Sequence, residues 1–370
     1  MKILIVTGDH PKNVIGGSEY QSYLIAKELL NYTKDVLFIG IDSKYNEEGN
    51  IDNLKFICFK KKSLHKYFKF YNLLKSYRPD ILYVRTFYSF WWIKIIGQLL
   101  NVKVIYAIHS VTQCRFLKFK IFFELKGVRE KIRYLRKYFL HNLNILFLLK
   151  HDYIICQTQE QKNLLKEKLD YRKQVSVIPN AHPVPKYEII KCNRCLKVAW
   201  VGKYFKNPDL YIKLAEAFSD YDGINFFMIG VFPYKYKRYY EFINQKLHNF
   251  EFLGQLNIHE VNKFLENTHI LIDTSDYEGF PNTFIQSWLR KVVVISLKVN
   301  PDNILTEEKI GLCSGSFEQM VKDLKFLFER RDIYNFYSQR CYDYAKKNFN
   351  ISNIGKLYHN LFNEAILKQK

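Results

Sequence analysis

The sequence predicts an α/β protein with two doubly wound, Rossmann-like parallel sheets. Short, β-branched apolar runs alternate with longer helix-like stretches along the chain, as in strand–helix–strand units. Most of these runs are continuously apolar rather than alternating, which is typical of parallel strands buried on both faces. The 370 residues are enough for two domains. These observations exclude a disordered chain, a collagen and a coiled-coil rod.

Seven strand candidates and four helix candidates fill the first half of the chain. The strand candidates are residues 2–6, 35–41, 55–59, 80–85, 103–108, 153–157 and 175–178. The helix candidates are residues 17–30, 64–77, 89–100 and 160–169. Because parallel strands need long crossover connections, this order favours a parallel sheet with helices on its faces.

A second strand–helix series begins after a proline-rich segment. Three prolines fall within residues 179–185, which indicates a linker. The later strand candidates are residues 196–201, 224–229, 250–253, 270–273 and 292–297, and the later helix candidates are residues 317–329, 332–348 and 351–370. We therefore expect an N-terminal domain over 1–185 and a C-terminal domain over 186–350. We expect the last helix, 351–370, to pack back toward the N-terminal domain.

The positive charge is concentrated in the first half of the chain. The net charge is +21, and residues 55–150 carry 21 Lys and Arg against three acids, which accounts for +18 of it. A one-sided basic surface attracts polyanions such as nucleic acid or an anionic membrane. No helix-turn-helix, zinc finger or RNA-binding motif accompanies this charge. We therefore expect an anionic membrane surface as a partner, and no nucleic acid.

Residues 115–150 have the composition of a basic amphipathic helix. Such a helix lies in a membrane interface with its apolar side down. The alternative is a domain helix whose apolar face meets the sheet and whose basic face meets water. The aromatic and basic side chains concerned are Phe116, Phe122, Phe123, Tyr134 and Phe139, and Lys118, Lys120, Arg129, Arg133, Arg136 and Lys137.

The sequence shows neither a spanning helix nor a disulfide framework. No run of about 18 apolar residues is free of charge, and the first residues do not form a signal-peptide pattern. The seven cysteines are odd in number, and Cys192 and Cys195 form a CxxC without a second pair, so we expect free thiols and no metal site. A reducing compartment fits best. We expect a cytoplasmic protein, peripheral on the inner face of the cell membrane.

A glycine-rich loop follows the first predicted strand. The loop ends in Gly16-Gly17-Ser18-Glu19, directly before a predicted helix. Glycines at this position let the backbone approach a phosphate or a sugar, and a helix N-terminus offers free N–H donors. The spacing is not GxGxxG, so no dinucleotide site is indicated. The alternative is a loop turn with a helix N-cap.

A carboxylate block follows the strand candidate 270–273. Glu278 precedes a turn that Gly279 and Pro281 fix, and we expect Asn282 or Thr283 to cap a helix over 284–289. A helix N-terminus can hold a diphosphate. Gln286 lies one turn into this helix, from where it could reach a ribose hydroxyl.

Two lysines follow the strand candidate 196–201. Gly202 is followed by Lys203, and Lys206 lies three residues further on. Cations at the carboxyl edge of a parallel sheet can neutralise a leaving diphosphate. The alternative is a pair of solvated lysines.

Together these motifs resemble the family 4 glycosyltransferases, which are retaining enzymes of the GT-B fold, with two Rossmann-like domains facing across a cleft. The resemblance covers almost the whole chain. Pro301-Asp302-Asn303 also resembles members that act on cell-surface polysaccharide. The matching motifs are Gly16-Gly17-Ser18-Glu19, His109, Val177-Ile-Pro-Asn180-Ala, Val201-Gly202-Lys203 with Lys206, Phe252-Leu-Gly254 and Glu278-Gly-Phe-Pro-Asn-Thr-Phe-Ile-Gln286.

The resemblance implies transfer of a sugar from a nucleotide diphosphate sugar to a saccharide or lipid-linked saccharide, without a metal ion or other cofactor. Glu278 would contact the donor sugar, and Lys206, helped by Lys203, would stabilise the leaving diphosphate. His109 would lie near the transferred sugar, although it could equally be a structural histidine. The substrate-binding residues implied are Gly16, Gly17, Gly202, Gly279, Phe280, Pro281, Asn282, Thr283 and Gln286.

The chain departs from the family pattern at three places, which leaves other functions open. Gln286 occupies the position at which the family usually has a second glutamate. Lys203 occupies a position at which arginine is common, and Lys291-Val-Val293 replaces the family's Gly-x-Pro. An amide can still bind a ribose, but a lysine loses the bidentate fork of arginine. A non-catalytic glycosyltransferase-like subunit and a sugar-nucleotide epimerase on the same fold remain alternatives, and a nucleic-acid binder is a more remote one.

Overall fold

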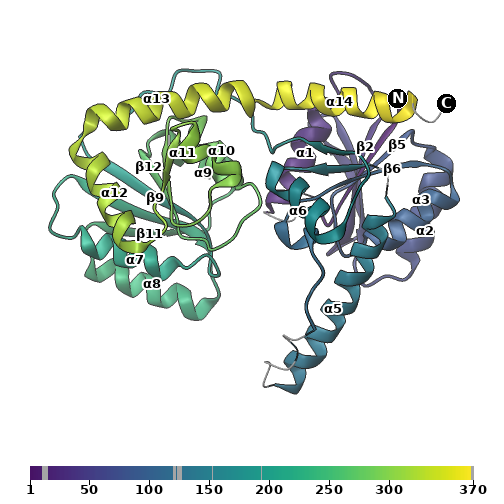
Figure 1. The fold of residues 1–370 in the computed structure, drawn as a ribbon, viewed down its shortest axis with the longest axis horizontal. Coiled ribbons are helices and arrows are strands. Elements are labelled where there is room, and N and C mark those ends of the chain that lie inside the picture. Colours follow the sequence, from purple (N-terminus) through teal and green to yellow (C-terminus); the bar gives the residue numbers. More distant parts are fainter. Residues whose placement is uncertain (11–15, 120–121, 123–126, 152, 193, 368–370) are drawn as a thin grey trace. The chain divides into compact units, whose positions relative to one another are not determined.

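The chain divides into two compact units. A computed structural model describes residues 1–10, 16–119, 122, 127–151, 153–192 and 194–367. Unit 1 comprises Met1–Ala181 and Ile351–Lys370, and unit 2 comprises His182–Asn350. Each unit contains one sheet with helices on both faces (Figure 1).

The sheet of unit 1 has eight strands in the order β3-β4-β2-β1-β5-β6-β7-β8. All neighbouring pairs are parallel except β3 and β4. The strands are β1 (Ile3–Thr7), β2 (Val36–Ser43), β3 (Glu47–Ile51), β4 (Leu54–Lys60), β5 (Ile81–Val84), β6 (Lys103–Ala107), β7 (Ile154–Cys156) and β8 (Val175–Val177).

Strand β3 lies outside the sequence expectations for a physical reason. Ile51 is its one apolar side chain and three of its five residues are exposed, so no apolar run marks it. It forms because Asp52 and Asn53 both adopt positive φ angles of 51° and 66°, as a two-residue hairpin turn requires. The turn adds an antiparallel edge strand to an otherwise parallel sheet.

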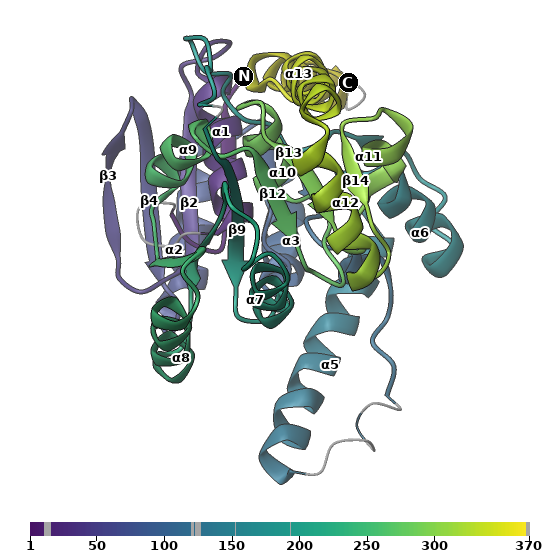
Figure 2. The same ribbon diagram turned by 90° about the vertical axis from the view of Figure 1, so that its left-hand side faces the viewer.

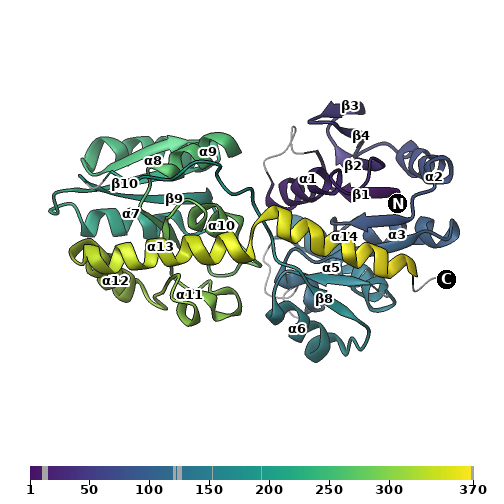
Figure 3. The same ribbon diagram turned by 90° about the horizontal axis from the view of Figure 1, so that it is seen from above.

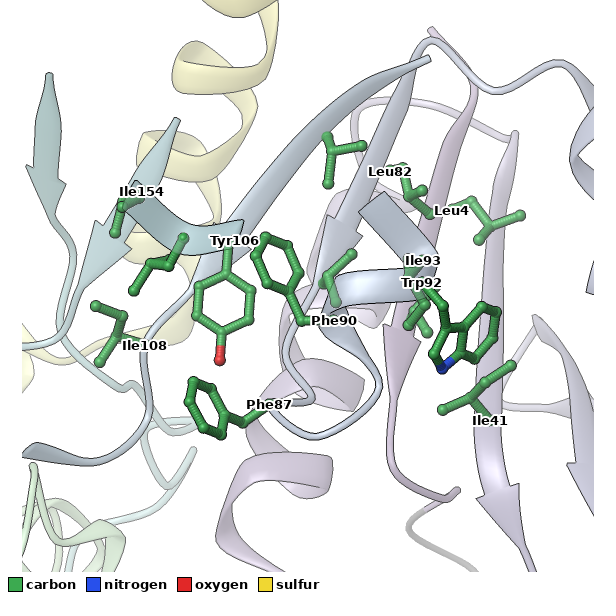
Figure 4. Packing of buried hydrophobic residues seen from close by; sticks show 14 of the residues in the cluster. Leu4, Ile41, Leu82, Phe87, Phe90, Trp92, Ile93, Tyr106, Ile108 and Ile154 are labelled. Atoms are coloured by element: carbon green, nitrogen blue, oxygen red, sulfur yellow. The ribbon is translucent and has the colours of Figure 1, made fainter. Parts of the chain in front are cut away.

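Side chains of this sheet alternate between two hydrophobic cores. Leu4 and Val6 of β1 face a core completed by α2 (His65–Tyr77), α3 (Phe90–Leu99), α5 (Val128–Leu149) and α6 (Gln159–Leu169). Figure 4 shows this packing around Phe90, Tyr106 and Trp92. Ile3 and Ile5 face a second core completed by α1 (Gly17–Leu29) and α14 (Ile351–Leu367). Burial on both faces explains why the strands are continuously apolar.

The C-terminal helix α14 packs beside α1 on one face of this sheet (Figure 3). Gly355 makes the contact possible, because a Cβ there would lie 2.2 Å from Cγ of Glu28. Tyr358 and Phe362 of α14 reach the sheet and pack against Tyr83. The last helix of the chain therefore belongs to unit 1.

The sheet of unit 2 has six parallel strands in the order β11-β10-β9-β12-β13-β14. The short strand β14 was not expected. The strands are β9 (Leu196–Lys203), β10 (Ile224–Val231), β11 (Phe250–Gly254), β12 (Ile270–Asp273), β13 (Val293–Ser296) and β14 (Gly311–Cys313). The helices are α7 (Pro208–Ala217), α8 (Tyr234–Lys246), α9 (Ile258–Glu266), α10 (Asn282–Trp288), α11 (Ile304–Glu307), α12 (Phe317–Glu329) and α13 (Arg331–Asn348).

Strand β12 is inserted between β9 and β13 although β10 and β11 separate it from β9 in the sequence. The strand order therefore changes direction between β9 and β12, since β10 and β11 lie on one side of β9 and β12 to β14 lie on the other. In doubly wound sheets, ligands usually bind at such a point, at the carboxyl ends of the strands. Helices cover both faces of this sheet, with α7, α8 and α12 visible in Figure 2. The predicted α/β fold with two parallel sheets is confirmed.

Helix α5 is shorter than the basic segment that predicted it. It begins at Val128, and Phe116 and Lys118 precede it outside regular helix. Phe123 and Lys120 lie outside the described residues. The first half of α5 projects from the body of unit 1 (Figure 2). The four buried residues of this helix, His141, Asn144, Ile145 and Leu148, all lie in its second half.

Candidate functional site

An ion pair lies at the carboxyl edge of the sheet of unit 2. Lys206 follows β9 and Glu278 follows β12, and these two strands are neighbours. The Nζ atom of Lys206 lies 2.5 Å from Oε1 of Glu278, and the two side chains are only 15% and 26% exposed. The structure therefore brings together two of the predicted catalytic residues.

A second carboxylate completes this group. Asp273, the last residue of β12, is buried and accepts hydrogen bonds from Oγ of Ser275 at 2.8 Å and from Oγ of Ser296 at 3.2 Å. Burial raises the pKa of Asp273, although the charge of Lys206 opposes the rise. Burial acts to lower the pKa of Lys206, but attraction to Glu278 and Asp273 outweighs it and raises that pKa. The ammonium therefore stays charged.

A hydrogen-bonded scaffold fixes the loop that carries Lys206. Nε1 of the buried Trp200 donates to Oγ1 of Thr274 at 2.8 Å, and that hydroxyl donates to the carbonyl of Lys206 at 2.6 Å. Asn207 donates to the carbonyl of Thr274 at 3.2 Å and to Asp276 at 2.8 Å. These bonds tie the loop after β9 to the loop after β12.

Gly202 is needed for this close approach. A Cβ at Gly202 would lie 2.7 Å from the Trp200 ring and 2.9 Å from Cδ of Lys206. A Cβ at Gly230, its partner in β10, would lie 2.2 Å from the carbonyl oxygen of Gly202. Gly202 thus makes room for the Lys206 side chain, and Gly230 makes room for the backbone of Gly202, which is a packing role for the predicted Gly202.

Lys203 is exposed at the end of β9. No ion pair joins it to another residue in the part of the chain that the structure describes. Its carbonyl accepts the backbone N–H of Lys206 at 2.9 Å, which closes a tight turn. The Lys203 side chain is therefore not fixed beside Glu278 as Lys206 is.

The helix after Glu278 begins earlier than the sequence predicts. Pro281 is the N-cap residue of α10, so Asn282 and Thr283 are its first two residues and not its caps. The helix has seven residues and no side-chain cap. Gly279, Asn282 and Thr283 are half-buried.

Two predicted substrate-binding residues of this block are occupied by internal contacts. Phe280 is buried and packs edge-on against Trp288 and Phe349. Gln286 is 2% exposed, and its Nε2 donates to Oδ1 of Asn262 at 2.8 Å. In this structure both side chains support the loop that carries Glu278.

The remaining predicted residues lie in unit 1. Gly16 is the N-cap of α1, and Gly17 is exposed at the first helical position. His109 follows β6, and Nε2 of its ring lies 2.9 Å from Nε2 of Gln113. Burial and the nearby charge of Arg85 lower the pKa of His109 to about 3. The imidazole is therefore neutral at physiological pH.

The sequence matches two protein-family models. Residues 15–183 match the model described as Glycosyltransferase Family 4, and residues 191–348 match the model described as Glycosyl transferases group 1. The two matches cover nearly all of the chain between them. The chain belongs to glycosyltransferase family 4. A comparison with curated protein sequences finds no match.

Solved structures share the fold of this glycosyltransferase at low sequence identity. HepE from Anabaena, solved in complex with UDP, has a TM-score of 0.73 at 14% identity, with 98% of this chain and 100% of that chain covered. Sucrose-phosphate synthase from Thermosynechococcus elongatus has a TM-score of 0.77 at 13% identity, with full coverage of both chains. A glycosyltransferase from Rickettsia africae has a TM-score of 0.72 at 15% identity, with 100% of this chain and 99% of that chain covered. The fold is therefore GT-B.

The sequence reasoning missed several residues of the glycosyltransferase that the structure places near the predicted ones. Asp273 is the polar end of an apolar strand, and Arg85 directly follows another, so both positions carry the signal of a charge at a carboxyl strand end. Trp200 and Thr274 act through hydrogen bonds that no local pattern predicts. Among the described residues there is no group of three or more potential metal ligands, and none of the described helices could cross a bilayer.

Proposed function

We propose that this glycosyltransferase transfers a sugar from a nucleoside diphosphate sugar to a saccharide or lipid-linked saccharide, with retention of the anomeric configuration. The observation that carries the proposal is the ion pair of Lys206 with Glu278 beside Asp273, at the reversal point of the sheet of unit 2. A cation and a carboxylate held together can bind the diphosphate and the adjoining sugar of such a donor.

When the donor binds, Lys206 and Glu278 would each replace their mutual contact by a contact with the donor. The diphosphate forms an ion pair with the ammonium of Lys206, and sugar hydroxyls donate hydrogen bonds to Glu278. The bond from C1 of the sugar to the phosphate oxygen then breaks, and a bond from C1 to the acceptor oxygen forms on the same face. The acceptor proton leaves with the nucleoside diphosphate. A fixed cation stabilises the charge that develops on the leaving group.

The lysines supply the charge that other transferases obtain from a divalent ion. Lys206 keeps its proton because its raised pKa lies above physiological pH, and Lys203 adds a second cation on the same turn. We therefore propose that the reaction needs no metal ion. Gly16 and Gly17, His109, and the backbone of Gly279–Thr283 are proposed to contact the substrates.

The donor class is supported by proteins of the same fold. Three HepE structures hold UDP, UDP with glucose, or UDP-glucose. A trehalose-6-phosphate synthase structure from E. coli holds UDP-2-fluoro glucose.

An apolar stripe on α5 supports a membrane partner. Val128, Ile132, Phe139 and Leu146 are all more than half exposed. Their spacings of four and seven residues place them on one face of the helix. Because soluble surfaces rarely leave such a stripe uncovered, it marks an interaction surface.

Basic side chains lie to one side of this stripe. Arg129, Arg133, Arg136 and Lys137 are exposed on the same projecting half of the helix. A different face of the helix packs on the preceding segment, through Tyr138 against Phe119. We propose that α5 lies on an anionic membrane, apolar side down, where the enzyme meets a lipid-linked acceptor in cell-surface polysaccharide synthesis. The membrane face would be the cytoplasmic one.

The test is a reaction with UDP-, GDP-, ADP- and CDP-sugars and a lipid-linked saccharide, followed by NMR of the anomeric proton. We expect one nucleotide sugar to release its nucleoside diphosphate and to give a product with the donor's anomeric configuration, also in the presence of a chelator. Conversion of the donor without an acceptor would instead indicate an epimerase. Absence of turnover with every donor would indicate a non-catalytic subunit.

A further inference from the structure

A buried arginine lies at the carboxyl edge of the sheet of unit 1. Arg85 directly follows β5 and is 3% exposed. Its Nη2 donates to Oδ1 of Asn180 at 2.7 Å, while its buried Nε has no hydrogen-bond partner. Within the described ranges, no carboxylate forms an ion pair with this guanidinium.

This arrangement lowers the stability of the folded protein. A guanidinium stays charged at any physiological pH, and burying a charge without a counter-ion is unfavourable. The one amide acceptor is also shared, because Oδ1 of Asn180 accepts from Nε2 of Gln157 at 3.0 Å as well. Within the part of the chain that the structure describes, Arg85 therefore has one shared amide oxygen as acceptor and no ion-pair partner.

Three groups whose pKa the charge of Arg85 shifts are neutral. They are His109 at the end of the neighbouring strand β6, and the hydroxyls of Tyr106 and Tyr358. The first turn of α1 also reaches this position, since Oγ of Ser18 donates to the carbonyl of Arg85 at 3.3 Å. Within the described ranges, no carboxylate at this edge forms an ion pair with Arg85, although Glu19 lies in the same first turn of α1.

We propose that Arg85 binds an oxyanion of the acceptor, a phosphate or a carboxylate, beside His109 on unit 1. This assignment rests on the proposed function. The donor is assigned to Lys206 and Glu278 of unit 2, so the anion site on unit 1 is assigned to the acceptor. Arginine forms two parallel hydrogen bonds with such groups, and Nε of Arg85 has one free donor for this purpose. The acceptor class is thus an anionic or phosphate-linked saccharide.

The experiment follows the ring protons of His109 by NMR while inorganic pyrophosphate is added to the full chain. Saturating UDP, or whichever nucleoside diphosphate binds, occupies the donor position first. We expect the His109 signals to shift with pyrophosphate in the presence of the nucleotide. In Arg85→Gln the apparent affinity should fall by about tenfold or more, because a charge-assisted pair of hydrogen bonds is lost.

Two controls locate the anion. Arg172→Gln removes an exposed arginine of the same unit, paired with Asp170, and Lys213→Ala removes an exposed lysine of unit 2. Both should leave the titration unchanged. If Arg85→Gln does not fold, Arg85→Lys, which keeps the charge and loses the fork, should still weaken binding several-fold.

The proposal is overturned if pyrophosphate leaves the His109 signals in place, or if Arg85→Gln and the wild type titrate alike. It is also overturned if the nucleotide alone shifts His109 and blocks pyrophosphate, because the anion would then belong to the donor. Calorimetry of nucleotide binding on the same samples reports separately on the proposed function.

Discussion

The ammonium of Lys206 lies 2.5 Å from the carboxylate of Glu278, although each residue stands in a different loop. The two loops meet because β9 and β12 are neighbours in the sheet and because Thr274 binds both Trp200 and the Lys206 carbonyl. Parallel strands bring their carboxyl ends to one edge, so residues distant in the sequence converge there.

Replacing either member of this pair should abolish most of the turnover. Lys206→Ala removes the cation that stabilises the leaving diphosphate, and Glu278→Ala removes the acceptor for the sugar hydroxyls. The loss of one such group costs about 100-fold or more in kcat. Steady-state rates measured with the best donor check this expectation.

Exposed residues of α7 in the same unit provide matched controls. Lys213→Ala and Glu216→Ala remove the same chemical groups from solvent-exposed positions and should retain wild-type rates. If Lys206→Ala and Glu278→Ala keep more than a tenth of the activity, the pair does not hold the donor.

Gly202 and Gly230, which are paired in the neighbouring strands β9 and β10, should tolerate no side chain. Gly230→Ala places a Cβ 2.2 Å from a backbone oxygen of Gly202, and backbone cannot move away as a flexible side chain can. We expect the free energy of unfolding to fall by about 1–3 kcal/mol, as overpacking does. Chemical denaturation gives the value. Gly127→Ala, whose Cβ would meet only a Glu130 side chain at 3.4 Å, should change stability less.

Sequence patterns predicted the strands and helices of both units closely because buried parallel strands are continuously apolar. The predicted range 317–329 is that of α12. Patterns failed at β3, where a turn with two positive φ angles and not apolarity forms the strand. They also failed to anticipate that Phe280 and Gln286 are turned inward, because Trp288 and Asn262 hold them through contacts between separate segments.

The sequence alone does not distinguish Arg85, for a related reason. A cation after an apolar strand is ordinary in a sequence, and only the structure shows that its Nε is buried without a partner. Lys206 and Glu278 can be predicted because each lies in a sequence motif at the end of a predicted strand, but their direct contact depends on strand order.

His109 should remain neutral in the whole pH range of activity. Its pKa is lowered to about 3, first by burial and then by Arg85. Because the unfolded chain takes up the proton near pH 6.5, stability should fall as the pH drops from that value toward 3. In Arg85→Gln the pKa of His109 should rise but stay below 6.5, since burial remains. NMR titration of the ring protons measures it, and an unchanged pKa in the variant would refute the electrostatic link.

The stripe on α5 should control binding to anionic vesicles. Ile132→Asp and Phe139→Asp place charges on the apolar face, so co-sedimentation with vesicles rich in phosphatidylserine should fall severalfold. Reversing Arg133 and Arg136 to Glu should weaken binding by about 1 kcal/mol or more per residue. Ile190→Asp, at a position 79% exposed in unit 2, is the matched control. Equal binding of all variants would rule out α5 as the docking surface.

The most direct test of the central claim is a thermal-shift series with UDP, GDP, ADP and CDP on the wild type and on Lys206→Ala. A ligand that binds only the folded state at 100 times its Kd stabilises it by about 2.7 kcal/mol. We predict that one of the four raises the melting temperature of the wild type and that Lys206→Ala loses most of this shift while Lys213→Ala keeps it. An equal shift in Lys206→Ala, or no shift with any of the four in the wild type, would contradict the account.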